Sequence, residues 1–297
     1  MKSKIAVIVC GNSGIDYLEH NYKIDVFRSI LYVDKDEYED FIDITADQFY
    51  QRLCNNPDVD VKTSQTSTGK MREVYKRLET NGFTDVIVIT ISSYLSGTYQ
   101  NAVLAAELVK NLKIHVFDSR FAVYPEAKMA LLAAKMAGAG SSVEEIIKEL
   151  DWIRNNSRVY FCVDTLKYLV KNGRLSSAAG FLGTILKLKP LLWINPEGKI
   201  ESVEKIRTSK RVIERVKEKF FEETKDLDFE PFIIYTTNFE LANDVAKDIK
   251  TAYPTIKNVV LQPLTPVVGA HTGPGAFGIG YIKKHKRDEV NEVKNIN

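Results

Sequence analysis

Residues 86–100, VIVITISSYLSGTYQ, decide the fold of this chain. The first six are β-branched and mainly apolar, which is typical of a strand buried on both faces of a parallel sheet. Hydroxyl-bearing and small residues follow at 92–98, and apolar residues then return at helical spacing. The stretch therefore predicts a strand, a hydroxyl-rich turn and the start of a helix.

The turn has the composition of an anion-binding site. The first turn of a helix exposes unpaired backbone N–H groups at the positive end of the helix dipole. Gly97 would let a ligand approach the backbone closely, and Ser96 and Thr98 add hydroxyl groups. The carboxyl end of a parallel strand is a common place for such a site. The alternative is an ordinary serine N-cap with no ligand.

Composition sets outer limits on the function. The chain has 297 residues, of which 44% are hydrophobic and 27% charged, so a globular protein with one or two domains is expected. A net charge of +2 gives no support for a nucleic-acid partner. Cys10, Cys54 and Cys162 have no CxxC spacing, which argues against a disulfide framework or a metal site and favours the cytoplasm. No apolar run is long enough to span a membrane, and the run at 5–10 is too short for a signal peptide.

A second hydroxyl-rich turn, residues 63–67, also opens a helical pattern. If both turns follow parallel strands, they lie on the same edge of one sheet and can converge on one ligand. The alternative is two independent helix caps.

Strands and helices alternate along the chain, which predicts an α/β fold. In the first half, strands are expected at 5–10, 24–33, 86–91 and 113–118, and helices at 45–53, 122–138 and 141–153. After residue 156 the pattern restarts with a strand at 159–163, a short helix at 166–170, an apolar stretch at 181–188, a hairpin at 190–207, helices at 211–224 and 241–252, and strands at 232–235, 259–261 and 278–282. We expect an N-terminal domain at 1–156 and a C-terminal domain at 157–290.

Several short motifs stand out: TSQTS at 63–67, ISSYLSGTY at 91–99, LKYLVKNGRL at 166–175, KPL at 189–191 and GAHTGPG at 269–275. In this order they resemble the signature turns of the DegV family. Several independent motifs in register over nearly the whole chain make the resemblance specific.

The resemblance implies a long-chain fatty acid bound in a tunnel between two α/β domains, the first with a mainly parallel sheet and the second with a mixed sheet. The best understood members are the fatty-acid-binding subunits of bacterial fatty acid kinase. They present the fatty acid to a separate ATP-binding kinase subunit, which makes acyl-phosphate for phospholipid metabolism. By this resemblance the chain is a cytoplasmic lipid-binding protein rather than an enzyme. It would have no cofactor or metal, and transient contact with a membrane surface is compatible with the role.

The family's site residues fall on specific positions of this sequence. The carboxylate would be bound by Ser64, with Thr63 beside it, and by Ser96 with Gly97. His271 would contact the same carboxylate and, with Arg174, support phosphoryl transfer. Without the resemblance, Arg174 is most simply a charge at a helix end, and His271 a turn histidine bonded to backbone.

The sequence departs from the family's pattern at three places. The usual Asp-Ser-Thr opening after the first strand is replaced by CGNS at 10–13, the proline of the TSQ turn by Thr66, and one glycine before Arg174 by Asn172. None of these changes removes a donor at the carboxylate site. The first leaves open what the opening aspartate contributes.

Two other functions remain as alternatives. One is a stand-alone lipid carrier or sensor with no kinase partner. The other is an enzyme, such as a hydrolase that uses Ser96, but no GxSxG elbow surrounds this serine and no Walker lysine follows a glycine loop.

Overall fold

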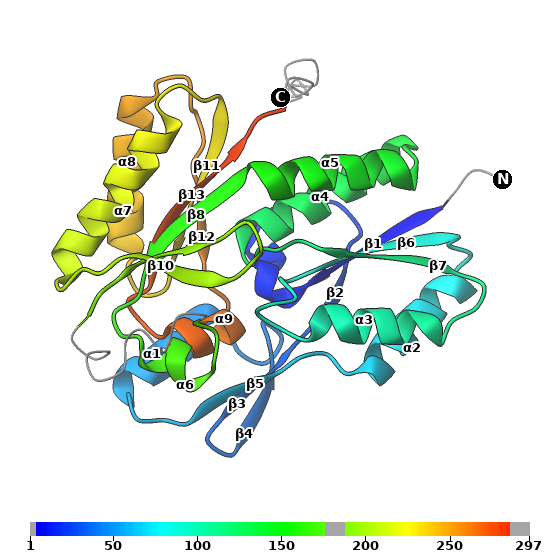
Figure 1. Ribbon diagram of the computed structural model, residues 1–297. Helices are drawn as coiled ribbons and strands as arrows, with labels where there is room; N and C mark the ends of the chain where they lie inside the picture. Colours follow the sequence, from blue (N-terminus) through cyan, green and yellow to red (C-terminus); the bar gives the residue numbers. More distant parts are fainter. Residues whose placement is uncertain (1–3, 176–187, 286–297) are drawn as a thin grey trace.

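The computed structural model describes residues 4–175 and 188–285. Two larger β-sheets, each flanked by helices, lie side by side, with a small third sheet below the space between them (Figure 1). The four-stranded sheet comes from the first half of the chain and the six-stranded sheet from the second half.

The four-stranded sheet is entirely parallel, in the order β2-β1-β6-β7. Its strands are β1 (Ile5–Cys10), β2 (Asp25–Phe27), β6 (Asp85–Thr90) and β7 (Lys113–Asp118). Helices α2 (Thr68–Thr80) and α3 (Thr98–Glu107) cover one face, and α4 (Tyr124–Ala139) and α5 (Val143–Asn156) cover the other (Figure 1). Because both faces are covered, every residue of β6 is buried, as its β-branched sequence predicts.

The six-stranded sheet is mixed, in the order β10-β9-β8-β13-β11-β12. Its strands are β8 (Ser157–Cys162), β9 (Leu191–Ile194), β10 (Ile200–Glu204), β11 (Phe229–Tyr235), β12 (Val260–Pro263) and β13 (Phe277–Lys283). Helices α7 (Ser209–Thr224) and α8 (Phe239–Ala252) cover its outer face (Figure 1). The inner face turns toward the first half of the molecule and contributes Phe161 and Ile234 to the buried cluster shared by the two halves.

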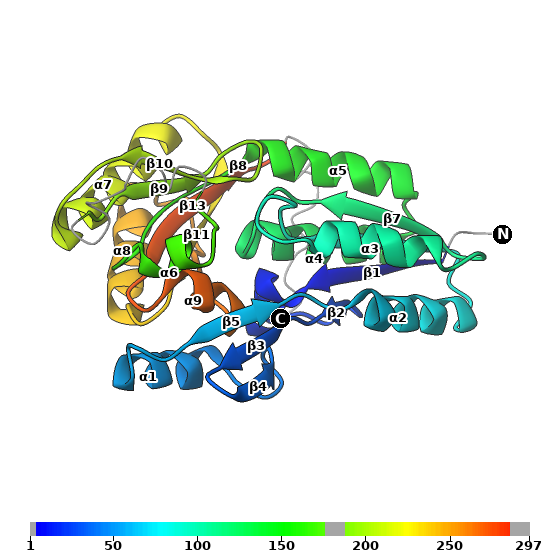
Figure 2. The ribbon, with the colours of Figure 1, turned by 60° about the horizontal axis from the view of Figure 1, so that its bottom comes forward.

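The third sheet is small and antiparallel, and it lies next to the last helix of the chain. Its order is β4-β3-β5, with β3 (Ile30–Val33), β4 (Asp36–Glu39) and β5 (Val61–Ser64). Helix α9 (Pro266–Thr272) contacts β3 and β5 and also packs on α1 (Ala46–Asn55) and α6 (Lys167–Lys171) (Figure 2). Segments from both ends of the chain therefore meet at α9.

The α/β class, with a parallel sheet first and a mixed sheet second, is confirmed. The helices expected at 45–53 and 141–153 are present as α1 and α5, and Thr45 and Ser142 each close a capping box at their starts. The hairpin at 190–207 is formed by β9 and β10. The apolar stretch at 181–188 lies, apart from Leu188, outside the described residues.

One expectation about strands was wrong, and one condition set for the convergence of the two turns is not met. The stretch 24–33 is not one strand, because the chain breaks at Arg28, which forms an ion pair with Asp16 at 2.7 Å and leads from β2 into β3 of a different sheet. The TSQ turn does not follow a parallel strand, since β5 pairs antiparallel with β3.

Within the described residues, no helix is both long enough and apolar enough to cross a lipid bilayer.

Candidate ligand-binding site

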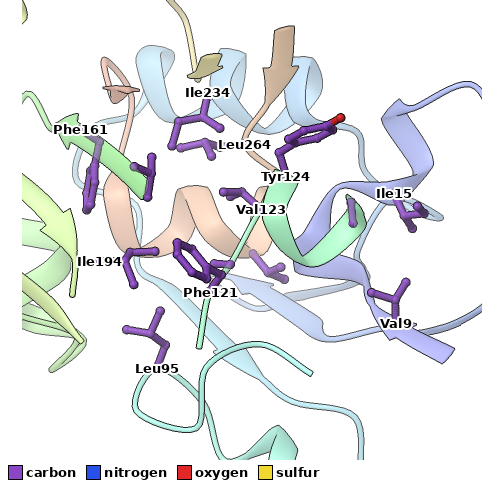
Figure 3. Close-up of a cluster of buried hydrophobic side chains, with 14 of the residues drawn as sticks. Val9, Ile15, Leu95, Phe121, Val123, Tyr124, Phe161, Ile194, Ile234 and Leu264 are labelled. Carbon is purple, nitrogen blue, oxygen red and sulfur yellow. The ribbon is translucent and has the colours of Figure 1, made fainter. Parts of the chain in front are cut away.

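A cavity of about 300 Å³ lies between the carboxyl edge of the parallel sheet and the inner face of the mixed sheet. Its volume is at the lower end of the range for small-molecule sites. Most of its wall is apolar and is formed by Ile91, Leu95, Ala122, Val123, Val159, Phe161, Leu169, Ile194, Ile200, Ile234, Leu264, Val267 and Val268. Figure 3 shows how some of these side chains converge from separate elements: Leu95 and Val123 from the parallel half, and Phe161, Ile194 and Ile234 from the mixed sheet.

Five of the six predicted site residues line this cavity: Thr63, Ser64, Ser96, Arg174 and His271. They come from four segments that are far apart in the sequence. The hydroxyl-rich turns therefore do converge on one space, although β5 reaches it from the small antiparallel sheet rather than from the parallel one.

The two serines differ in how much of their bonding capacity is already used. The Ser64 hydroxyl, at the end of β5, makes no hydrogen bond within the described part of the chain. The Ser96 hydroxyl donates to Gln65 Oε1 (3.3 Å), lies 2.8 Å from Thr98 Oγ1 and accepts from the Thr98 backbone N–H (3.3 Å). Ser96 is not the N-cap of α3, since Gly97 takes that position without a side-chain cap.

Gly97 is the predicted site residue that is not among those lining the cavity. A Cβ at this position would lie 2.8 Å from the side-chain nitrogen of Gln65. The close approach that Gly97 permits is therefore made by Gln65, which holds the two hydroxyl-bearing turns together. We read Gly97 as a packing requirement of the site.

His271 lies in the last turn of α9, not in an irregular turn as the glycine-rich sequence suggested. Its Nε2 lies 2.9 Å from Thr63 Oγ1, whereas its Nδ1 is buried and has no hydrogen-bond partner among the described residues. Burial, and secondly the charge of Arg174, lower the pKa of His271 to about 4. The lowered pKa favours the neutral imidazole at physiological pH, and none of the described residues competes with a ligand atom for its Nδ1.

Arg174 is half-buried and is fixed by the main chain. Its Nε donates to the Leu95 carbonyl oxygen (3.1 Å) and its Nη1 to the Asn172 carbonyl oxygen. Burial lowers the pKa of the Arg174 guanidinium from its usual value. Asn172, where the family pattern has glycine, donates from its side chain to the Ala270 carbonyl oxygen (3.1 Å) and so ties this turn to the helix that carries His271.

Thr98, whose hydroxyl group the sequence analysis placed in the turn, also lines the cavity. Sequence reasoning gave no role to four further polar residues of the wall: Asn12, Ser29, Gln65 and Thr272. Gln65 and Thr272 lie inside two of the motifs, so their position in the sequence was a usable signal. Asn12 and Ser29 follow β1 and β2, which are neighbours in the sheet, and no local pattern predicts that pairing.

Comparison with known proteins finds similar proteins that match nearly the full length of this chain. The model of the DegV family, described as "Uncharacterised protein, DegV family", matches residues 4–284. A DegV domain-containing protein of Staphylococcus aureus is 33% identical over 287 residues, which is 96% of this chain and 99% of that protein.

Solved structures of similar proteins share the fold. DegV, a fatty acid binding protein from Bacillus subtilis, is 31% identical with a TM-score of 0.83, and the match covers 95% of this chain and all of that one. A fatty acid binding DegV family protein from Streptococcus agalactiae is 27% identical with a TM-score of 0.86 over the same shares of the two chains.

Proposed function

This chain belongs to the DegV family, and we propose that it binds a long-chain fatty acid in the cavity and presents the carboxylate to a separate ATP-binding kinase subunit. One observation carries the proposal: an apolar cavity has, among its lining, a Ser64 hydroxyl and a His271 Nδ1 that find no hydrogen-bond partner in the described part of the chain. Similar proteins from Bacillus subtilis and Streptococcus agalactiae are described as fatty acid binding, which supports the proposal.

The binding energy is divided between the acyl chain and the head group. Each methylene transferred from water to the apolar wall contributes about 0.8 kcal/mol, so the chain supplies most of the affinity. A carboxylate in such surroundings must be hydrogen-bonded or it takes up a proton. Ser64, with Thr63 beside it, Ser96 and His271 would bond it and so fix its orientation, while Gly97 keeps the two turns close.

If the carboxylate is presented for phosphoryl transfer, Arg174 and His271 would both take part in that reaction. A guanidinium offers a fixed fork to phosphate oxygens, and a neutral histidine donor can stabilise charge that develops on the acyl oxygen. The protein itself would carry no cofactor or metal, and the nucleotide would come with the kinase subunit. A reaction that uses ATP would take place in the cytoplasm, and brief contact with a membrane surface would load the lipid. The site would lie at the junction of domains 1–156 and 157–290.

A stand-alone lipid carrier or sensor is the second candidate. It is favoured by the bonding of Arg174, whose Nε and Nη1 already donate to backbone carbonyl groups. These bonds alone would give Arg174 a structural role in shaping the loop. The two candidates differ in whether Arg174 is needed for acyl-phosphate formation.

The direct test of the proposal is the lipid that the protein carries. Protein purified without detergent is expected to hold a long-chain fatty acid in near-stoichiometric amount, measured by mass spectrometry after denaturing extraction. A protein that carries no lipid and fails to bind added fatty acid would contradict the proposal.

Replacing Ser96 with alanine is expected to weaken fatty acid binding by about 10- to 100-fold, because a hydrogen bond to a charged group contributes about 1.5–3 kcal/mol. The dissociation constant is measured by displacement of a fluorescent fatty acid. The matched control is Ser93→Ala in the same loop, since the Ser93 hydroxyl donates to Asp118 (2.6 Å) and does not line the cavity. Equal affinity in the two variants would remove Ser96 from the site.

A further inference from the structure

Asn12 places a polar side chain in the cavity wall that the proposed function does not use. It lies in the short turn Gly11–Ser13 that follows β1, is only 6% exposed and lines the cavity. Its side-chain nitrogen donates to Glu126 Oε2 at 2.6 Å. Glu126 belongs to the first turn of α4 and is fully buried.

This pair leaves hydrogen-bonding capacity unused inside the protein. Within the described part of the chain, the bond to Glu126 is the only one that the Asn12 side chain makes. One amide N–H and the amide oxygen of Asn12 therefore remain open. Glu126 itself does not line the cavity, and its second oxygen, Oε1, is buried beside Cys10. Buried polar groups are nearly always paired, because an unpaired one is destabilising, so the open N–H and oxygen of Asn12 point to a ligand atom.

The electrostatic surroundings decide which kind of ligand atom fits. Burial raises the pKa of Glu126 well above its usual range, although hydrogen bonds from Asn12, the Cys10 backbone N–H and the Cys10 thiol oppose the shift. Burial therefore disfavours a negative charge at this end of the cavity wall. An anion would also face the amide oxygen of Asn12, which only accepts. A group that both donates and accepts complements the open N–H and oxygen of Asn12, and a hydroxyl does both.

We propose that Asn12, positioned by Glu126, binds a hydroxyl group on the acyl chain, so that the cavity takes a hydroxylated fatty acid. The inference rests on the proposed function, because it assumes an acyl chain in the cavity. The contact comes from a part of the sequence that departs from the family pattern, since Asn12 lies in the CGNS stretch that replaces Asp-Ser-Thr.

The test compares stearic acid with a set of monohydroxystearic acids that differ in the position of the hydroxyl. The wild-type protein is expected to bind at least one isomer as tightly as stearic acid. In the double variant Asn12→Leu/Glu126→Met, the affinity for that isomer relative to stearic acid should fall by about 10- to 100-fold, because its hydroxyl is then buried without a partner. The double variant removes both polar groups together, so no unpaired carboxyl remains to unfold the protein, and thermal unfolding checks this.

Ser96→Ala serves as the reference variant, because it should weaken stearic acid and the hydroxylated isomer by the same factor. If stearic acid binds but the affinity for the hydroxylated isomer relative to stearic acid is the same in the wild type and the double variant, the hydroxyl contact is wrong and the proposed function stands. If every isomer binds the wild type 10-fold or more weakly than stearic acid, the contact is also wrong. If neither stearic acid nor any isomer binds, both proposals fail.

Discussion

Acyl-phosphate formation with a cognate kinase subunit is expected to fall by about 10³-fold when Arg174 is replaced by methionine, since an arginine that stabilises a transferring phosphoryl group has effects of this size. Fatty acid binding should persist, because the apolar wall that supplies most of the affinity is intact. The rate is measured with labelled ATP and protein already loaded with lipid. The control is Lys171→Met, which removes a nearby positive charge that pairs with Asp60 outside the cavity.

The same Arg174→Met variant gives a second measurement that needs no kinase. Removal of the guanidinium should raise the pKa of His271 from about 4, because the Arg174 charge contributes to lowering it. The pKa should stay below the ordinary value of 6.5, because burial is the larger cause and remains. A wild-type rate of acyl-phosphate formation together with this raised pKa would favour the stand-alone carrier, since Arg174 would then touch the site without serving the reaction.

Replacing Asp40 with asparagine is expected to remove a large part of the pH dependence of stability. Asp40 is fully buried, and its two carboxylate oxygens make no hydrogen bond of good geometry in the described part of the chain. Burial raises its pKa from 3.8 to about 7, although the Val267 backbone N–H, the Arg28 charge and the Thr265 hydroxyl favour the ionised form; the charge of Asp16 adds to the rise. The folded protein therefore holds a proton on Asp40 that the unfolded chain releases above about pH 4.

The folded state binds this proton more tightly than the unfolded chain does. The contribution of Asp40 to the free energy of unfolding is therefore complete below about pH 4 and is lost as the pH rises to about 7. The rise in the Asp40 pKa from 3.8 to about 7 corresponds to a loss of at most about 4 kcal/mol in the free energy of unfolding. Urea unfolding of delipidated protein should show that Asp40→Asn is more stable than the wild type at pH 8, with the advantage shrinking toward pH 4. His271 acts in the opposite sense, since its lowered pKa costs stability as the pH falls from 6.5 toward 4, but it is common to both proteins.

Asp58→Asn is the control for this measurement, because its side chain is 95% exposed. Its unfolding free energy should run parallel to that of the wild type across the pH range. Parallel curves for Asp40→Asn as well would mean that the Asp40 carboxyl is hydrated in solution, contrary to its complete burial in the structure.

The sequence was most informative where a local pattern determines the structure. The β-branched run in β6, the capping boxes at Thr45 and Ser142 and the glycine-bearing hairpin between β9 and β10 each follow from short-range chemistry. The site residues were found through motifs, and most of them line one cavity. Their roles in binding and phosphoryl transfer remain predictions.

What the sequence did not reveal depends on contacts between distant segments. The break at Arg28 is decided by its ion pair with Asp16 and by the pairing of β3 with β5, neither of which has a local signal. His271 was expected in a turn, because glycine and proline surround it. It is helical because α9 is held on four sides by α1, α6, β3 and β5, and Gly269 lets the Tyr50 ring approach closely.

The apolar cavity between the two sheets also has a consequence for the lifetime of the protein. A ligand that binds only the folded state stabilises it, by about 2.7 kcal/mol at a concentration 100 times its dissociation constant. If the cavity holds a fatty acid as proposed, its loss would leave Phe161, Ile234 and their neighbours with fewer packing partners, so the unloaded molecule would open and be degraded more readily. Starving a cell of lipid would then reduce the abundance of this protein, with no change in its synthesis.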